Sequence, residues 1–382
     1  MCVARRALRV GAHLMLVLMV WEVCARIDDA SSDRAPLLGA HDYTVMLKHD
    51  ALGVTGVPFA HYQKWQLNSL GFRGPELQAQ RARIICIGSS ETFGLYEAPG
   101  MEYPRQLERE LSSRSSANQY EVANVAYAGQ TLGSFLRRSG QVISRLQPEI
   151  AVIYPGLTSY IEPSSADTDA WVPEKQHFQL RIKAKLFNLL DRVLPGPLQT
   201  ARYRFKIWRN TRGRPVMERI PESDVGRFRQ DLSQLLDTLK QHNVKAVLVT
   251  HATRFGTEVL REDLPLLTQW RSAYPNLKED GFLDMEVRLN AVMREQAAAR
   301  DLPLVDAAKM LSGQSYFADW AHFTDRGAHA MASAIAEVIL ARWPAERHDA
   351  STSIVMLRSN YGCDGRTPGL TKPSNSGVGI CQ

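Results

Sequence analysis

Two stretches carry most of the information about fold and chemistry in this chain: RIICIGSSETFG at residues 83–94 and DWAHFTDRG at residues 319–327. The isoleucine-rich start of the first predicts a buried strand, and Gly88 ends it, so that two serines lie on the turn beyond. In the second, Asp319 and His322 stand three residues apart before a predicted helix. At that spacing a carboxylate can orient an imidazole that accepts a proton from a serine hydroxyl. Together the two stretches indicate acyl transfer.

Each stretch taken alone has a plainer explanation. A serine pair after glycine is commonly turn chemistry, and Asp-x-x-His commonly occurs in a loop or helix cap. The chain between them predicts a parallel α/β sheet, in which ligand sites gather at the carboxyl ends of the strands. The predicted strands are residues 83–87, 120–125, 150–154, 245–250 and 302–306. The predicted helices include residues 103–111, 132–146, 224–241, 285–300 and 328–343.

These residues resemble the SGNH hydrolases, also called the GDSL-like esterase and lipase superfamily. The family's Gly-Asp-Ser-x-[ST]-x-Gly block is similar to GSSETFG at residues 88–94, which gives Ser90 the nucleophile position. The segment ANVAYAGQT resembles the block whose glycine amide lies in the oxyanion hole, with Gly129 in that role. Asp319 and His322 match the final Asp-x-x-His block. The resemblance implies a three-layer α/β/α fold with a flavodoxin-like parallel sheet of about five strands, a Ser-His-Asp triad and no cofactor.

Two positions depart from the family pattern. Ser89 stands where the family has aspartate, and YPGLTSY at residues 154–160 places Thr158 where the family supplies a side-chain amide. A threonine hydroxyl can donate one hydrogen bond from a shorter side chain. The expected oxyanion hole therefore comprises the amides of Ser90 and Gly129, with Thr158 as a third donor. His251, which closes a predicted strand, is expected to line or support the pocket.

The composition is that of a folded enzyme, with 382 residues, 45% hydrophobic and 23% charged. Its five cysteines show no metal-ligand spacing. Cys86 lies in a predicted strand and is expected in the core. Cys363 and Cys381 either pair in an oxidising compartment or remain free.

The N-terminal residues 1–26 are predicted to be a signal peptide or a membrane anchor. Three arginines precede an apolar run at residues 10–24, which is shorter than the roughly 20 residues of a comfortable span. No Ala-x-Ala site stands out, so an uncleaved anchor is favoured, with a periplasmic catalytic domain held at the inner membrane. Cleavage would instead give a secreted protein. The plainer alternative is an amphipathic helix of a soluble protein.

A basic segment lies between the third and fourth predicted strands. Residues 171–220 hold twelve Lys or Arg against three acidic residues, a net charge of +9 where the whole chain has +6. It falls within a predicted insertion at residues 160–222 that includes a helix at residues 180–193. A solvated basic helix pair is the plain interpretation. The sharper one is a cap that approaches anionic lipid headgroups or an acidic polysaccharide, and no nucleic-acid-binding module is recognisable.

The expected organisation places a lead-in at residues 27–82, which includes LNSLGFRGPE, similar to the lead-in of longer bacterial envelope members. The hydrolase domain follows at residues 83–345, and a mobile tail at residues 346–382. The expected function is that of a serine esterase acting on an acyl or acetyl ester of a carbohydrate or lipid. One alternative is an O-acyltransferase for envelope or exported polysaccharide that uses the same triad. The other, motivated by Thr158, is a catalytically silent envelope protein that binds carbohydrate or assists assembly.

Overall fold

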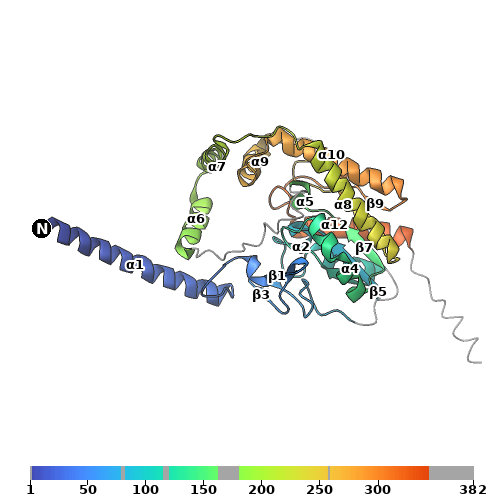
Figure 1. Cartoon of the computed structure of the whole chain (residues 1–382), viewed down its shortest axis with the longest axis horizontal. Coiled ribbons are helices and arrows are strands. Elements are labelled where there is room, and N and C mark those ends of the chain that lie inside the picture. The colour runs from blue at the N-terminus through green and yellow to red at the C-terminus, as the bar shows by residue number, and fades with distance from the viewer. Residues whose placement is uncertain (1, 79–81, 115–119, 162–179, 257–258, 344–382) are drawn as a thin grey trace, which may run out of the picture. The chain divides into compact units, whose positions relative to one another are not determined.

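A computed structural model describes residues 2–78, 82–114, 120–161, 180–256 and 259–343 (Figure 1). Its centre is a parallel sheet of five strands in the order β6-β5-β7-β8-β9. The strands are β5 (Ala82–Ile87), β6 (Tyr120–Asn124), β7 (Ile150–Ile153), β8 (Lys245–Val249) and β9 (Leu304–Val305). The predicted flavodoxin-like α/β/α fold is confirmed, because the chain order 2-1-3-4-5 is that of a doubly wound sheet.

Both faces of the sheet are buried, which explains why its strands are continuous apolar runs. In β5, Ile85 and Ile87 belong to one hydrophobic cluster, and Ile84 and Cys86 belong to another. Alternate residues of a strand point to opposite faces, so the two clusters are the two sides of the sheet. Cys86 is fully buried, as the sequence predicted.

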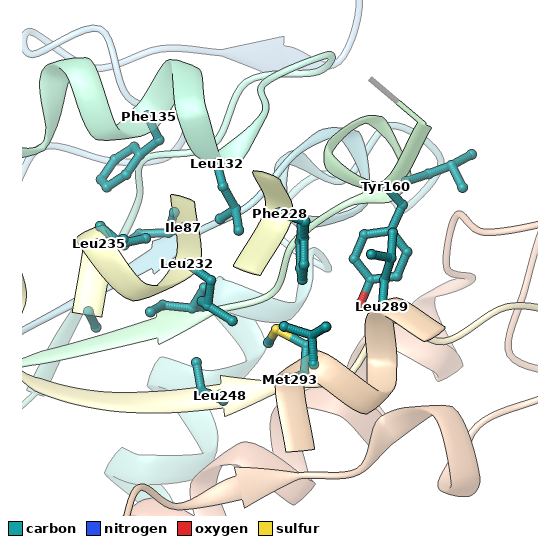
Figure 2. Packing of buried hydrophobic residues seen from close by; sticks show 14 of the residues in the cluster. Ile87, Leu132, Phe135, Tyr160, Phe228, Leu232, Leu235, Leu248, Leu289 and Met293 are labelled. Carbon is teal, nitrogen blue, oxygen red and sulfur yellow. The ribbon is translucent and has the colours of Figure 1, made fainter. Parts of the chain in front are cut away.

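The helices divide between these two faces. The Ile85 and Ile87 face is covered by α4 (Leu132–Leu146), α8 (Glu222–Gln241), α9 (Leu264–Ala273) and α10 (Glu279–Ala299). Figure 2 shows Leu232 and Leu235 of α8 packed among residues of this cluster. The opposite face is covered by α3 (Tyr103–Arg114) and α12 (Asp325–Arg342). All five predicted helices are present; α10 begins six residues earlier than expected, and α9 was not predicted.

The lead-in forms two antiparallel pairs, β1 (Leu47–Asp50) with β2 (Gly53–Gly56) and β3 (His61–Tyr62) with β4 (Trp65–Gln66), after a short 3-10 helix, η1 (Tyr43–Met46). Met46 of η1, Tyr62 of β3 and Trp65 of β4 share a small hydrophobic cluster with Phe93. Phe93 ends the one-turn helix α2 (Ser90–Phe93), so the lead-in packs directly on the turn that follows β5.

Three helices lie outside the sheet core. The first, α1 (Cys2–Ser32), contains the stretch Arg9–Ser32, which by length and composition alone could cross a membrane. The predicted insertion contains α6 (Arg181–Val193), at the position expected, and α7 (Gly196–Thr211). The short elements α5 (Leu157–Ile161), η3 (Arg261–Asp263) and α11 (Ala307–Met310) complete the described residues. The expected tail and the Cys363 and Cys381 pair lie outside them.

Candidate active site

The turn between β5 and α2 determines where Ser90 lies. A Cβ at Gly88 would overlap the Thr92 hydroxyl and the Tyr154 carbonyl, so only glycine lets the chain turn this sharply. The Thr92 hydroxyl instead lies 3.1 Å from the hydroxyl of Tyr103, within hydrogen-bond distance. Ser90 then begins α2 immediately beyond the carboxyl end of a central strand.

The far end of α2 is held from two sides. The Arg73 guanidinium donates to the Phe93 carbonyl and lies 5.0 Å from the centroid of the Phe93 ring. Asn124, at the end of β6, donates its side-chain N–H to the Thr92 carbonyl at 2.8 Å. These contacts occupy carbonyls that a one-turn helix cannot satisfy internally. The lead-in and the neighbouring strand therefore fix the helix that carries Ser90.

The structure brings together the three residues predicted to form the triad. His322 Nε2 lies 2.9 Å from Ser90 Oγ, and His322 Nδ1 lies 2.8 Å from Asp319 Oδ2. Because an ionised carboxylate can only accept, Nδ1 carries the proton and Nε2 is left as an acceptor for the Ser90 hydroxyl. This is the hydrogen-bond order that lets an imidazole take a proton from a serine.

Local backbone geometry holds Asp319 in place. Its Oδ1 accepts the amides of Ala321 and His322, both at 2.9 Å, while its Oδ2 faces the imidazole. Burial disfavours the charged carboxylate, yet the His322 imidazole and the two amides lower the pKa of Asp319 below its ordinary value. Burial likewise opposes the imidazolium, but Asp319, with Glu91 and Glu97, raises the pKa of His322. The ring of Tyr96 lies against the imidazole, with centroids 5.1 Å apart.

The predicted oxyanion donors meet at the side chain of Ser89. The Gly129 amide donates to Ser89 Oγ at 3.1 Å, and Ser89 Oγ lies 3.2 Å from Thr158 Oγ1. Ser89 Oγ accepts from the Gly129 amide, and either hydroxyl can be the donor in its contact with Thr158. Ser89 is fully buried. The residue that replaces the family aspartate thus links the loop after β6 to the loop after β7.

A second carboxylate contacts Ser90. Glu91 is 1% exposed, and its Oε2 lies 3.2 Å from Ser90 Oγ, as a second and more distant acceptor than His322 Nε2 for the one hydroxyl hydrogen. Its Oε1 accepts the Leu157 amide at 2.8 Å, immediately before Thr158. A Cβ at Gly156 would overlap the Glu91 carboxylate, so this close approach requires glycine. Glu91 therefore connects the serine to the loop after β7.

Behind Glu91 lies a buried imidazole shared by two carboxylates. His251 Nδ1 lies 2.9 Å from both Glu286 oxygens, and His251 Nε2 lies 3.4 Å from Glu91 Oε1. Burial alone would lower the pKa of His251, but Glu286 and Glu91 raise it well above the ordinary value. Burial raises the pKa of Glu286. Burial also opposes the charged form of Glu91, but His251, then His322 and the Leu157 amide, lower the pKa of this carboxylate. Asn290 completes the cluster by accepting the His251 amide at 2.8 Å.

The sequence analysis did not identify Glu91 or Glu286 as site residues. A signal exists in α10, where Glu286 and Asn290 are spaced four residues apart on a face otherwise occupied by Met285, Leu289 and Met293. Polar residues at helical spacing within an apolar stripe require buried partners. His251 is one of these partners, and through Glu91 it lies one residue from Ser90. Among the residues that the structure describes, no group of three or more His, Cys, Asp or Glu side chains could hold a metal ion.

The Ser90, His322 and Asp319 side chains lie in hydrogen-bond contact at the carboxyl edge of a doubly wound sheet. The family model for the GDSL-like lipase/acylhydrolase family matches residues 86–330. The chain belongs to this family, and its class of reaction is ester hydrolysis. None of the curated proteins compared with this chain matches it.

Solved structures of the same kind are similar at low identity. An acetyl xylan esterase is 15% identical, with 67% of this chain and 99% of that one covered and a TM-score of 0.41. The lipase/acylhydrolase from Enterococcus faecalis is 16% identical, with 68% and 96% covered and a TM-score of 0.40. A catalytic mutant of an acetylxylan esterase from Geobacillus stearothermophilus is 14% identical, with 69% and 96% covered and a TM-score of 0.41.

Glu91→Gln should lower the pKa of His322. The charged and titratable groups that face this imidazole are Asp319, Glu91, Glu97 and Tyr96, and an ionised Glu91 favours the imidazolium. Removing that charge lowers the pKa of His322, so the imidazole stays neutral down to a lower pH than in the wild type. An NMR titration, with the His322 signal assigned by its absence in His322→Gln, measures the shift.

Glu121→Gln is the control, because Glu121 is also buried but pairs with Arg83 on β5. An unchanged His322 titration in Glu91→Gln would mean that Glu91 exerts no charge effect on the triad.

Proposed function

We propose that this chain is a membrane-anchored serine esterase of the cell envelope, with Ser90 as nucleophile, His322 as general base and then acid, and Asp319 as the residue that orients His322. The single observation that carries the proposal is the continuous hydrogen-bonded order from Ser90 Oγ to His322 Nε2, at 2.9 Å, and from His322 Nδ1 to Asp319, at 2.8 Å. Membership of an ester-hydrolysing family supports the same chemistry.

The proposed reaction has two halves. Ser90 Oγ attacks the ester carbonyl while its proton moves to His322 Nε2, and the alcohol leaves with that proton as the carbonyl re-forms. A water molecule then gives a proton to His322 and attacks the acyl-serine, which releases the acid and restores the Ser90 hydroxyl. Asp319 stabilises the imidazolium formed in each half.

The negative oxygen formed in each half requires donors. The Ser90 amide is the first amide of α2, where helix N–H groups lack intrahelical acceptors. We assign Gly129 and Thr158 to the same role, in which the Gly129 amide exchanges its Ser89 acceptor for the oxyanion. For Thr158 the support is its position, because its hydroxyl lies 3.2 Å from the hydroxyl of Ser89, the residue beside Ser90. These donors act on charge that develops only in the transition state.

The substrate proposed is an acyl or acetyl ester of a carbohydrate or lipid. A sugar hydroxyl in place of the water in the second half would make the same residues an O-acyltransferase, because the acyl-serine intermediate is common to both reactions. Product analysis with a carbohydrate acceptor distinguishes transfer from hydrolysis.

Ser90→Ala and His322→Ala should each lower kcat for p-nitrophenyl acetate by roughly 10⁴-fold or more, as expected for members of a cooperating triad. A fluorophosphonate probe should label the wild type and Ser113→Ala, an exposed-serine control on α3, but not Ser90→Ala. Circular dichroism checks that each variant is folded. Labelling that persists in Ser90→Ala would mean a different nucleophile, and a folded but unlabelled wild type would favour the catalytically silent alternative.

Thr158→Val should lower kcat by roughly 10²-fold, the loss typical of one oxyanion donor. Thr158→Ser keeps the hydroxyl and should retain most of the activity, which makes it the matched control. Steady-state kinetics with one generic ester compares the two. Equal kcat values for both variants would remove Thr158 from the oxyanion hole while leaving the triad intact.

A reporter active only outside the cytoplasm, fused after Trp343, should be active and should stay with membranes after a high-salt wash. The reason is that α1 contains a stretch long and apolar enough to span a bilayer, and that Arg5 and Arg6 precede this stretch. The same fusion lacking residues 2–32 is the control. Recovery of the full-length fusion in the cytosol would contradict the envelope assignment.

A further inference from the structure

Helix α6 carries an apolar face that the described part of the chain leaves exposed. Leu186, Leu189, Leu190 and Val193 are 53%, 57%, 36% and 69% exposed. Their spacing of three and four residues places them on one side of the helix. Soluble proteins seldom expose this many large apolar side chains together. We therefore expect a lipid or a partner molecule to cover this face and remove it from water.

Helix α7 also carries large apolar side chains that are exposed. Leu198, Phe205 and Trp208 are 54%, 59% and 53% exposed and recur at helical spacing. The rings of Phe205 and Trp208 lie 5.6 Å apart. We give the name α6–α7 face to seven exposed apolar residues of the two helices: Leu186, Leu189, Leu190, Val193, Leu198, Phe205 and Trp208.

The same two helices are strongly basic. Residues 181–212 contain nine Lys or Arg and a single Asp, a net charge of +8. Cations border the exposed rings, with Lys183 5.9 Å from the Phe187 ring centroid and Arg212 5.5 Å from that of Trp208. Apolar side chains edged by cations are typical of helices that lie in a membrane interface. The charge opposes a second copy as the occupant, since two faces of +8 would repel each other.

The start of α6 is bound to the candidate membrane helix α1 by hydrogen bonds and ion pairs. Glu22 of α1 accepts the amides of Arg181 and Ile182 at 3.1 Å, which caps the start of α6 with a carboxylate. The fully buried Arg181 side chain pairs with Asp29 at 2.8 Å. Lys185 adds a second contact to Asp29 at 2.7 Å. All these α1 residues follow most of its apolar run.

Apolar surface continues across this junction. A cavity of about 410 Å³ lies between α1 and α6 and is lined by Trp21, Ala25, Ile182, Leu186 and Leu189 among others. Two of these residues belong to the α6–α7 face. A surface that continues from a membrane-spanning stretch onto a basic amphipathic helix favours lipid over a soluble protein as the occupant.

We infer that α6 and α7 lie on the outer surface of the membrane that α1 crosses, with the α6–α7 face among acyl chains and the flanking Lys and Arg side chains at anionic lipid phosphates. The inference rests on the proposed anchoring of α1. It goes beyond that anchoring by giving the basic insertion its own lipid contact. Anionic lipid strengthens this contact, because each cation near such a surface adds to binding.

The experiment uses the full chain in nanodiscs of phosphatidylcholine with or without phosphatidylglycerol, in which brominated acyl chains quench nearby tryptophans. The difference between the wild type and Trp208→Phe isolates Trp208 emission, and Trp21→Phe isolates the anchor in the same way. We expect brominated lipid to reduce Trp208 emission roughly twofold with phosphatidylglycerol present, and less without it.

A double variant, Leu189→Asp with Phe205→Asp, should restore the emission of Trp208. The matched control is Val287→Asp, which replaces an apolar residue of α10 that is 67% exposed. This control should leave the quenching unchanged.

Quenching of Trp21 without quenching of Trp208 would overturn the inference and leave the anchoring intact. Loss of quenching at both residues would overturn the anchoring and the inference together. Brominated lipid could instead leave Trp208 unquenched while the double variant converts an oligomer to a monomer. That result would identify the face as an interface between copies of the chain and would also overturn the inference.

Discussion

Burial of strand β5 on both faces is the constraint on which the remainder of the site depends. Its alternate side chains fill two separate hydrophobic clusters, and it pairs with β6 on one side and β7 on the other. A strand confined in this way can present side chains to a ligand only beyond its end. Gly88 makes the turn there, and the loops after β6 and β7 end beside it. Ser90, Gly129 and Thr158 come from distant parts of the sequence but lie at one edge of the sheet for this reason.

The buried titratable side chains at this edge form two separate groups. Asp319 and His322 make one, and Glu91, His251 and Glu286 make the other, with Ser90 in contact with both. Taking carboxylates out of water is costly, and ion pairs inside a protein add little net stability even when well made. Retaining three buried charged groups behind the serine is therefore more readily explained by positioning than by stability. Glu91 in particular fixes the Leu157 amide, and with it the loop that carries Thr158.

The segments outside the sheet attach to the molecule by different interactions. The lead-in is bound through the Arg73 side chain and an apolar cluster that includes Phe93, so it contributes directly to the geometry of α2. The basic insertion is bound to α1 by carboxylates that accept the first amides of α6 and pair with Arg181. Ionic contacts of this kind fix one end of a helix pair and leave its apolar side available. The two additions thus serve different parts of the protein: one supports the serine, and the other extends the candidate anchor.

The sequence by itself determined the strands, the sheet class and the position of Ser90, Asp319 and His322 along the chain. These follow from local signals: apolar runs, the glycine that ends β5, and a three-residue spacing that lets one aspartate bind two nearby amides. Only the tertiary structure decided that Glu91 is buried against His251 and Glu286. Those residues lie 160 and 195 positions apart from Glu91, so no local pattern relates them. It also decided that Gly129 and Thr158 meet at Ser89, because that contact requires three parallel strands to end side by side.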